Sequence, residues 1–210
     1  MTRTVRWAMV AMAAVAATAT VAAKPKFTAV WKTPASYDVS LAGKKVAALV
    51  ITKDDSVRVA GEEALARELG ARGFQAVATY RSVPREEAAV AEKAKVWFER
   101  LGVEGVVALR PVAIDRKTTY SPSTWVSSSY TEFWGYYGYG WSSVYVPGHV
   151  DRNTVVIIET TIYSVPRNAL LWAGISETRN PEQLGPAVAE LAEECVKELH
   201  KVGLAKLIKK

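Results

Sequence analysis

The sequence predicts an α/β protein with a mixed sheet of about five strands. Its first half alternates short apolar runs with segments of helical periodicity, and its second half holds two alternating runs joined by a tight turn. Continuous apolar runs between helices are typical of parallel strands, and alternating runs joined by a turn are typical of an antiparallel hairpin. We therefore expect three parallel strands joined by right-handed crossovers, then a hairpin and a C-terminal helix.

The first residues have the pattern of an export signal. Met1–Arg6 carries two arginines, and an uncharged, Ala-rich run then extends to Ala23. A basic start, an apolar run and small residues at its end are typical of a secretory signal peptide, so we expect residues 1–23 to be removed. An uncleaved membrane anchor is the alternative, because the run is close to the shortest length that spans a bilayer. We expect an exported, periplasmic protein that is associated with the envelope. No cysteine comes directly after the run, so we do not expect a lipoprotein.

Charge and cysteine content exclude some classes of function. The net charge is +6, of which the signal contributes two charges, so the remaining chain is only mildly basic. That charge is not the footprint of a nucleic-acid-binding protein, and we expect no nucleic-acid partner. Cys195 is the only cysteine, which excludes an internal disulfide. It lies on an apolar stripe of the last helix, where a buried, inert thiol is a better interpretation than a reactive one.

After an entry segment over residues 24–44, we expect a single α/β domain over residues 45–205. The first half has expected strands over 45–52, 74–80 and 106–114. Between them we expect a helix capped at 54–56 and ending near Gly73, and a helix from 82 to Leu101 that ends at Gly102. Pro111 predicts a bulge or an edge in the third of these strands. The second half adds strands over 154–164 and 170–178, a turn at 166–168 where Asn168 can adopt a positive φ, and a helix from about Asn180 to Gly203.

An aromatic insert over residues 120–146 connects the third strand to the fourth. Its stretch from Tyr120 to Tyr145 holds half of the chain's Phe, Trp and Tyr residues, and Glu132 is the only charged residue there. Loops of this length without structure are uncommon in compact domains. We interpret the insert as a long hairpin that extends the third and fourth strands, with arms near residues 125–134 and 141–146 and a glycine-rich turn.

The rings of the insert have two interpretations. In one they pack on each other or on the scaffold; in the other several form a solvent-facing patch, which monomers rarely expose without a partner. The candidate binding residues are Trp125, Tyr130, Trp134, Tyr136, Tyr137, Tyr139, Trp141 and Tyr145. Such rings would suit one of four partners: an envelope protein, a second copy of the chain, a glycan or the membrane interface.

Several short motifs resemble a family of small exported bacterial envelope proteins, lipoprotein-like, that carry a domain of unknown function. The motifs are Val30–Pro34, Lys44–Val46, the Tyr/Gly-rich insert, Leu171–Gly174 and Ser176–Thr178. The resemblance covers nearly all of the chain after the signal. It implies an envelope location and an α/β fold, and it brings no catalytic residues.

Catalytic chemistry has little support in the sequence. His149 and His200 are the only histidines, with no second ligand at metal-binding spacing, so we expect no metal and no cofactor. A hydrolase built on His149 and Asp151 is the enzyme alternative, but nothing near them resembles an activated nucleophile. Asp54 and Asp55 follow a strand at the edge where α/β sheets bind ligands, although helix capping also explains them. We therefore expect a non-enzymatic envelope module that presents the aromatic hairpin for protein association or self-association, with binding of peptidoglycan or another polysaccharide as the alternative.

Overall fold

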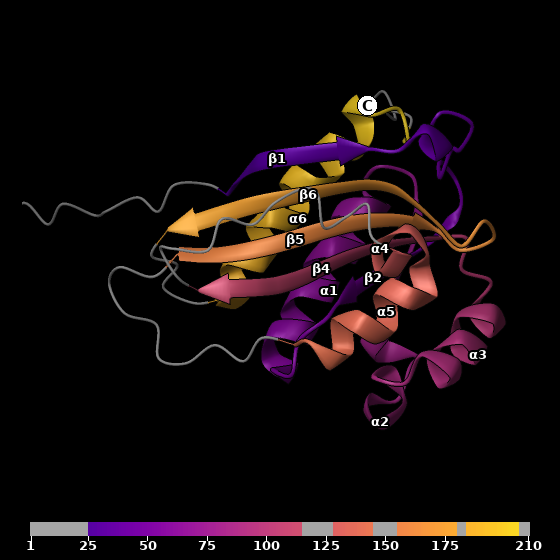
Figure 1. Ribbon diagram of the computed structural model, residues 1–210, viewed down its shortest axis with the longest axis horizontal. Helices are drawn as coiled ribbons and strands as arrows, with labels where there is room; N and C mark the ends of the chain where they lie inside the picture. Colours follow the sequence, from indigo (N-terminus) through magenta and orange to yellow (C-terminus); the bar gives the residue numbers. More distant parts are fainter. Residues whose placement is uncertain (1–24, 115–127, 145–154, 180–183, 206–210) are drawn as a thin grey trace, which may run out of the picture.

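The computed structural model describes residues 25–114, 128–144, 155–179 and 184–205. A six-stranded sheet lies between two layers of helices (Figure 1). The strand order is β1-β6-β5-β4-β2-β3, in which β2 pairs in parallel with β3 and β4 while β5, β6 and β1 join by antiparallel pairing. The predicted mixed α/β fold is confirmed, with one strand more than expected.

The strands are β1 (Lys26–Lys32), β2 (Lys45–Val50), β3 (Gln75–Ala78), β4 (Gly105–Ile114), β5 (Val155–Ser164) and β6 (Ala169–Arg179). The α-helices are α1 (Asp55–Gly70), α2 (Arg85–Ala88), α3 (Ala91–Leu101), α4 (Ser128–Thr131), α5 (Phe133–Ser142) and α6 (Leu184–Lys201). Two short 3-10 helices, η1 (Pro34–Ser36) and η2 (Thr79–Arg81), follow β1 and β3. The three crossover strands, the hairpin and the last helix lie where the sequence predicts them.

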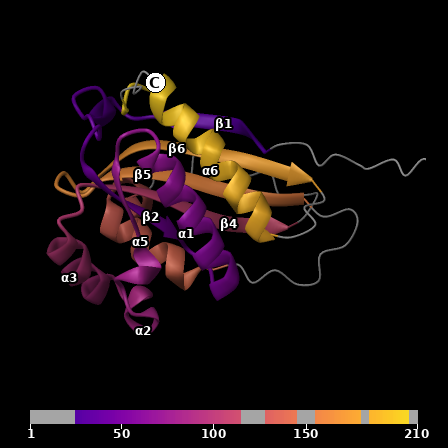
Figure 2. The same cartoon turned by 180° about the vertical axis from the view of Figure 1, so that it is seen from behind.

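The continuous apolar run in β2 is explained by burial on both sides of the sheet. Val46, Ala48 and Val50 belong to the core beneath α1 and α6. Ala47 and Leu49 belong to the core on the other face, which α2, α3, α4 and α5 cover. Figure 2 shows α1 and α6 side by side across the first face. Because successive side chains of a strand point to opposite faces, a two-sided core requires apolar residues at every position.

The entry segment predicted over residues 24–44 contains the sixth strand. β1 pairs antiparallel with β6, with Lys32 opposite Trp172, and forms one edge of the sheet. Its burial alternates, and Phe27 meets the Trp172 ring edge-on with centroids 5.1 Å apart. The sheet therefore begins before the domain boundary that the sequence predicts.

Local backbone features agree with the sequence in most places. Gly102 ends α3 at φ 63°, and Asn168 adopts φ 45° in the hairpin turn. The pairing of β4 with β5 shifts register just after Pro111, as its missing N–H predicts. The helix predicted from residue 82 to Leu101 is divided, because Val90 is extended and separates α2 from α3.

Asp54 caps α1 as predicted. Its carboxylate accepts hydrogen bonds from the backbone N–H groups of Ser56 and Val57, at 2.9 and 3.1 Å. The Ser56 hydroxyl donates to the same oxygen at 2.6 Å. Chiefly the Ser56 hydroxyl, and then the Val57 N–H, lower the pKa of Asp54 below its ordinary value of 3.8. The carboxylate form is thus the one that stabilises the start of the helix.

Asp54→Ala is expected to lower the free energy of unfolding at neutral pH by about 1 kcal/mol, because two N–H groups lose their acceptor. The lowered pKa makes this contribution complete above the ordinary pKa of 3.8 and removes it as the pH falls through the pKa of the folded state. Asp54→Asn keeps an acceptor without a titrating group, so it should lack this part of the pH dependence. Urea unfolding across the acidic range measures both effects, and an Asp54→Ala variant as stable as wild type at neutral pH would contradict the capping role.

Candidate functional site

The described part of the aromatic insert is helical, so the prediction of a hairpin with strand arms is wrong there. α4 and α5 cover residues 128–142, which we call the aromatic layer. The buried positions of α5 are Phe133, Tyr136, Tyr137 and Gly140. This spacing has the period of a helix, not the alternation of a strand. In the sequence, the period is hard to recognise because aromatic residues occupy most positions of α5.

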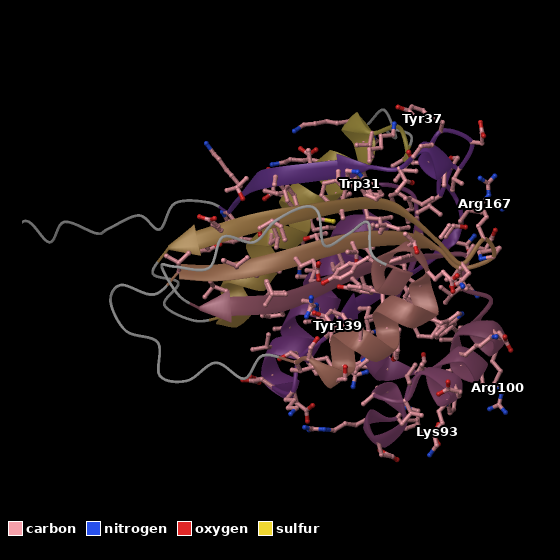
Figure 3. All side chains as sticks on the ribbon, in the orientation of Figure 1. Trp31, Tyr37, Lys93, Arg100, Tyr139 and Arg167 are labelled. Carbon is pink, nitrogen blue, oxygen red and sulfur yellow. The ribbon has the colours of Figure 1, made fainter. Side chains whose placement is uncertain are left out.

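Three of the six candidate rings in the described residues are inside the protein. Tyr130, Tyr136 and Tyr137 are buried, which contradicts their assignment to a solvent-facing patch. Trp134 and Trp141 are half-buried. Tyr139 is 41% exposed and is the one candidate in the described residues with a largely open ring (Figure 3). Trp125 and Tyr145 lie outside the described residues.

The aromatic layer packs between the sheet and α3. On the sheet side, Phe133 and Tyr136 each contact the ring of Tyr163 in β5, with centroids 5.3 Å apart. On the other side, Phe98 of α3 contacts Phe133, Trp134 and Tyr137 at 5.7, 5.7 and 6.0 Å. Tilted and edge-on contacts at such distances are favourable. The rings therefore form the core of this face of the protein.

An ion pair lies beneath the aromatic layer. Arg110 in β4 and Glu159 in β5 face each other across the two strands and are 2% and 0% exposed. The Arg110 Nε and Nη2 atoms each lie 2.8 Å from Glu159 Oε2. Burying two charges is costly unless they pair and their other hydrogen-bonding groups also find partners.

Those partners come from the aromatic layer. Arg110 Nη2 donates to the Tyr130 hydroxyl at 2.9 Å, and Nη1 donates to Ser143 Oγ, just beyond α5, at 3.1 Å. The Tyr136 hydroxyl donates to Glu159 Oε2 at 3.3 Å. Tyr139 also lies with its ring centroid 5.2 Å from the guanidinium carbon. The pair therefore joins the insert to the centre of the sheet.

The buried phenols are held as hydroxyl groups. Burial, and then the charge of Glu159, raise the pKa of Tyr136 far above its ordinary value of 10.0. Burial also raises the pKa of Tyr137 and of Tyr163. Tyr137 donates its hydroxyl hydrogen to the carbonyl of Ala88 in α2. Their hydrogen bonds orient the aromatic layer. Hydroxyl groups with raised pKa values are better suited to this structural role than to proton transfer.

The hairpin turn holds the start of α5. Asn168 Oδ1 accepts the Trp134 N–H at 3.3 Å, and its Nδ2 donates to Glu132 at 3.2 Å. Glu132, the single charge of the insert, therefore joins the aromatic layer to the turn between β5 and β6.

The outward face of α5 is built from small residues. Gly135 and Ser142 are exposed, and Gly138 lies between them on the same side of the helix. A Cβ atom at Gly138 would meet no heavy atom within 4 Å. Tyr139 flanks this face on the side of β4, Trp134 flanks it on the side of α3, and Trp141 lies near Arg58 of α1. The helix backbone is thus accessible between aromatic side chains.

Of the other candidate carboxylates, the two that the structure describes, Asp54 and Asp55, have structural partners. Asp54 caps α1 and Asp55 pairs with Arg85, while His149 and Asp151 lie outside the described residues. In the part of the chain that the structure describes, no three His, Cys, Asp or Glu side chains gather as metal ligands do. Cys195 is fully buried, and that burial raises the pKa of its thiol. Within the described residues, none of the helices combines the length and the apolar character needed to cross a bilayer.

Sequence reasoning missed Arg110 as a site residue, and it treated Glu159 only as a member of an alternating strand. The available signal was a single charged residue inside each of two apolar runs, Arg110 in one and Glu159 in the other. A charged residue in a strand that is covered on both faces needs a partner nearby. Neighbouring predicted strands that each carry one charge of opposite sign indicate such a pair.

Two glycines of α5 test its helical packing. Gly138→Ala is expected to raise the free energy of unfolding by about 0.5–1 kcal/mol, because alanine favours helix and its Cβ meets open space. Gly140→Ala is expected to lower it by roughly 1–3 kcal/mol, because of overpacking. Its Cβ would lie 2.8 Å from Ile51 Cδ1 in the core. Urea unfolding measures the free energy of unfolding of both variants. Equal effects of the two substitutions would contradict the helical placement.

Comparison with known proteins gives little beyond this geometry. No protein-family model matches the chain, and no curated protein matches it. Among solved structures, a dodecamer of a PelC point variant from Paraburkholderia phytofirmans is similar at 18% identity and a TM-score of 0.44, over 85% of this chain and 99% of that one. A PelC dodecamer from the same organism in another crystal form is similar at 14% identity and a TM-score of 0.43, with the same coverage. Likeness at this level does not extend to function or assembly.

Proposed function

We propose that this chain is a non-enzymatic module of the bacterial cell envelope that binds a protein partner, or a second copy of itself, through the outward face of α5. The observation that carries the proposal is the accessible backbone of that helix between Tyr139 and the two tryptophans. The envelope location rests on the signal-like pattern of residues 1–23. The contact surface is a helix face, not the hairpin that the sequence predicts.

The glycines support the proposal because stability alone does not favour them. Gly138 has open space around its Cα and lies inside a helix, where alanine is better by about 1 kcal/mol. A glycine at such a position permits close approach of another backbone. Gly135 extends the same accessible surface by one turn.

Tyr139 supplies the apolar anchor for the same contact. Its ring is 41% exposed, yet it is held from below by the Arg110 guanidinium and by the Tyr130 ring at 5.6 Å. A ring that is already ordered loses little conformational entropy on binding and offers a large contact area with a polar end. These are properties of residues that dominate protein interfaces.

A glycan is the second candidate ligand. The fixed and exposed face of Tyr139 favours it, because the CH faces of a sugar pack on aromatic rings. Trp134 and Trp141 are half-buried and offer less ring surface for such stacking.

The test compares Gly138→Gln and Tyr139→Ser with wild type in capture of envelope proteins and in analytical ultracentrifugation. Gly138→Gln places a side chain on the accessible backbone, and Tyr139→Ser removes the anchor, so both should abolish partner capture or self-association. Tyr37→Ser is the matched control, because Tyr37 is 75% exposed at the end of η1 and lies apart from α5 (Figure 3). Substitution of Tyr137 is unsuitable, because that ring is buried.

Folding is checked by the urea midpoint, which should not fall in Gly138→Gln, because glutamine favours helix over glycine and its Cβ meets open space. Association that persists unchanged in both α5 variants would sink the protein-binding proposal. Tryptophan fluorescence titrated with peptidoglycan and polysaccharide fragments examines the glycan candidate, and a flat response to every fragment argues against it.

A further inference from the structure

A second site lies at the carboxyl ends of β2 and β3. Here the first turns of α1 and the segment from η2 to α2 enclose a cleft of about 350 Å³. The residues that line it are Asp55, Arg58, Val59, Tyr80, Arg81, Ser82, Val83, Pro84 and Arg85. Ligands of α/β sheets bind preferentially beyond the carboxyl ends of parallel strands, and this volume is in the range of small-molecule sites.

One wall of the cleft contains a buried arginine with unused donors. Arg58 is 4% exposed, and its Nε atom donates to Glu62 Oε1 at 3.2 Å. Its Nη2 atom is covered and has no hydrogen-bond partner. Buried donors in native proteins are nearly always satisfied, and those of a guanidinium are the most costly to leave unpaired.

Glu62 already accepts four hydrogen bonds, of which Arg58 donates one. Its carboxylate already accepts the backbone N–H groups of Val50 and Tyr80, at 3.2 and 2.6 Å, and the Thr79 hydroxyl at 2.7 Å. Burial raises the pKa of Glu62, although Arg58 opposes that change. Glu62 therefore ties α1 to β2 and η2, and it leaves Arg58 with donors for another acceptor.

The other two arginines of the cleft are available to an anion. Arg81 pairs with Glu63 and Arg85 pairs with Asp55, and each of these two arginine side chains is 62% exposed. Exposed ion pairs contribute little stability, so an incoming anion can exchange with them at small cost. Both side chains are long and exposed, so they can turn toward a ligand in the cleft.

We propose that this cleft binds a small ligand through an oxyanion that carries more than one negative charge, a phosphate or a polycarboxylate, held by Arg58, Arg81 and Arg85. Three guanidinium groups in one cleft provide the planar forked donors that such oxyanions accept in pairs. None of the residues on the outward face of α5 lines the cleft, although the Arg58 guanidinium carbon also lies 6.0 Å from the ring of Trp141.

The test is calorimetric titration of the purified protein with sodium phosphate and, separately, with citrate, at constant ionic strength. Wild type should bind at least one of them saturably at one site per chain. The double variant Arg81→Gln/Arg85→Gln should weaken that binding by about tenfold or more, because charge-assisted hydrogen bonds are lost. Arg58→Lys, which keeps a cation beside Glu62 but removes Nη2, should weaken it as well.

Arg67→Gln is the matched control, because Arg67 is on α1, outside the cleft, and its side chain is 68% exposed. It should leave the affinity within about twofold, as expected for a screened surface charge. Binding of phosphate alone assigns a phosphate-bearing ligand, binding of citrate alone assigns a polycarboxylate, and binding of both assigns the shared oxyanion chemistry. Absence of saturable binding, or an equal loss in Arg67→Gln and the double variant, would overturn the proposal. Should Arg58→Lys fail to fold, the exposed double variant decides by itself.

Discussion

The ion pair of Arg110 and Glu159 constrains this structure more than any other contact. It lies at the centre of one face of the sheet, where both residues are almost fully buried. Attraction between two charges in such a place offsets the loss of hydration only when their remaining donors and acceptors are also satisfied. Because both side chains are almost inaccessible to bulk solvent, other parts of the chain supply those groups.

The aromatic layer meets this requirement. Tyrosine is suited to it, because each ring buries a large apolar area while its hydroxyl reaches a buried charge. Tyr130 and Tyr136 place their hydroxyls on the pair, and Gly140 lets the backbone of α5 approach the sheet closely. In the sequence, the many aromatic residues suggest a binding surface. In the structure, most of those described belong to the layer that covers the buried ion pair.

The two faces of the sheet differ for this reason. On one face α1 and α6 cover an apolar core, which includes Leu65, Leu191 and Cys195, and the buried carboxylate of Glu62 ties α1 to β2 and η2. On the other face the Arg110–Glu159 pair lies beneath α5, and its hydrogen bond with Tyr136 fixes where that helix can lie. On the outward side of α5, Gly135, Ser142 and the side of Tyr139 are exposed.

Much of the scaffold could be predicted from the sequence because its signals are local. The apolar run of β2, the cap at Asp54, the bulge after Pro111 and the turn at Asn168 each depend on neighbouring residues. β1 was missed because its pairing with β6 joins residues far apart in the chain, and its half-buried edge gives a weak pattern.

The aromatic insert was predicted wrongly because aromatic residues favour strands on average, while three glycines in α5 disfavour helix. Tertiary contacts override both preferences: the rings at helical spacing meet Tyr163, Phe98 and the ion pair only when the segment is helical. The buried pair itself depends on two strands being adjacent, which no local pattern of either strand reveals.

Hydrogen exchange of the α5 amides, measured by mass spectrometry in wild type and in Glu159→Gln, tests most directly whether the ion pair holds the aromatic layer on the sheet. The wild-type amides at the end of α5, where Ser143 N–H bonds to the Tyr139 carbonyl, should be protected like those of β4 and β5. Loss of the carboxylate leaves Arg110 unpaired, at a cost of about 3–5 kcal/mol, and should accelerate exchange in α5 by roughly a hundredfold more than in α1 and α6. Exchange in α5 that is unprotected in wild type, or that changes no more than exchange in α1 and α6, would contradict the account.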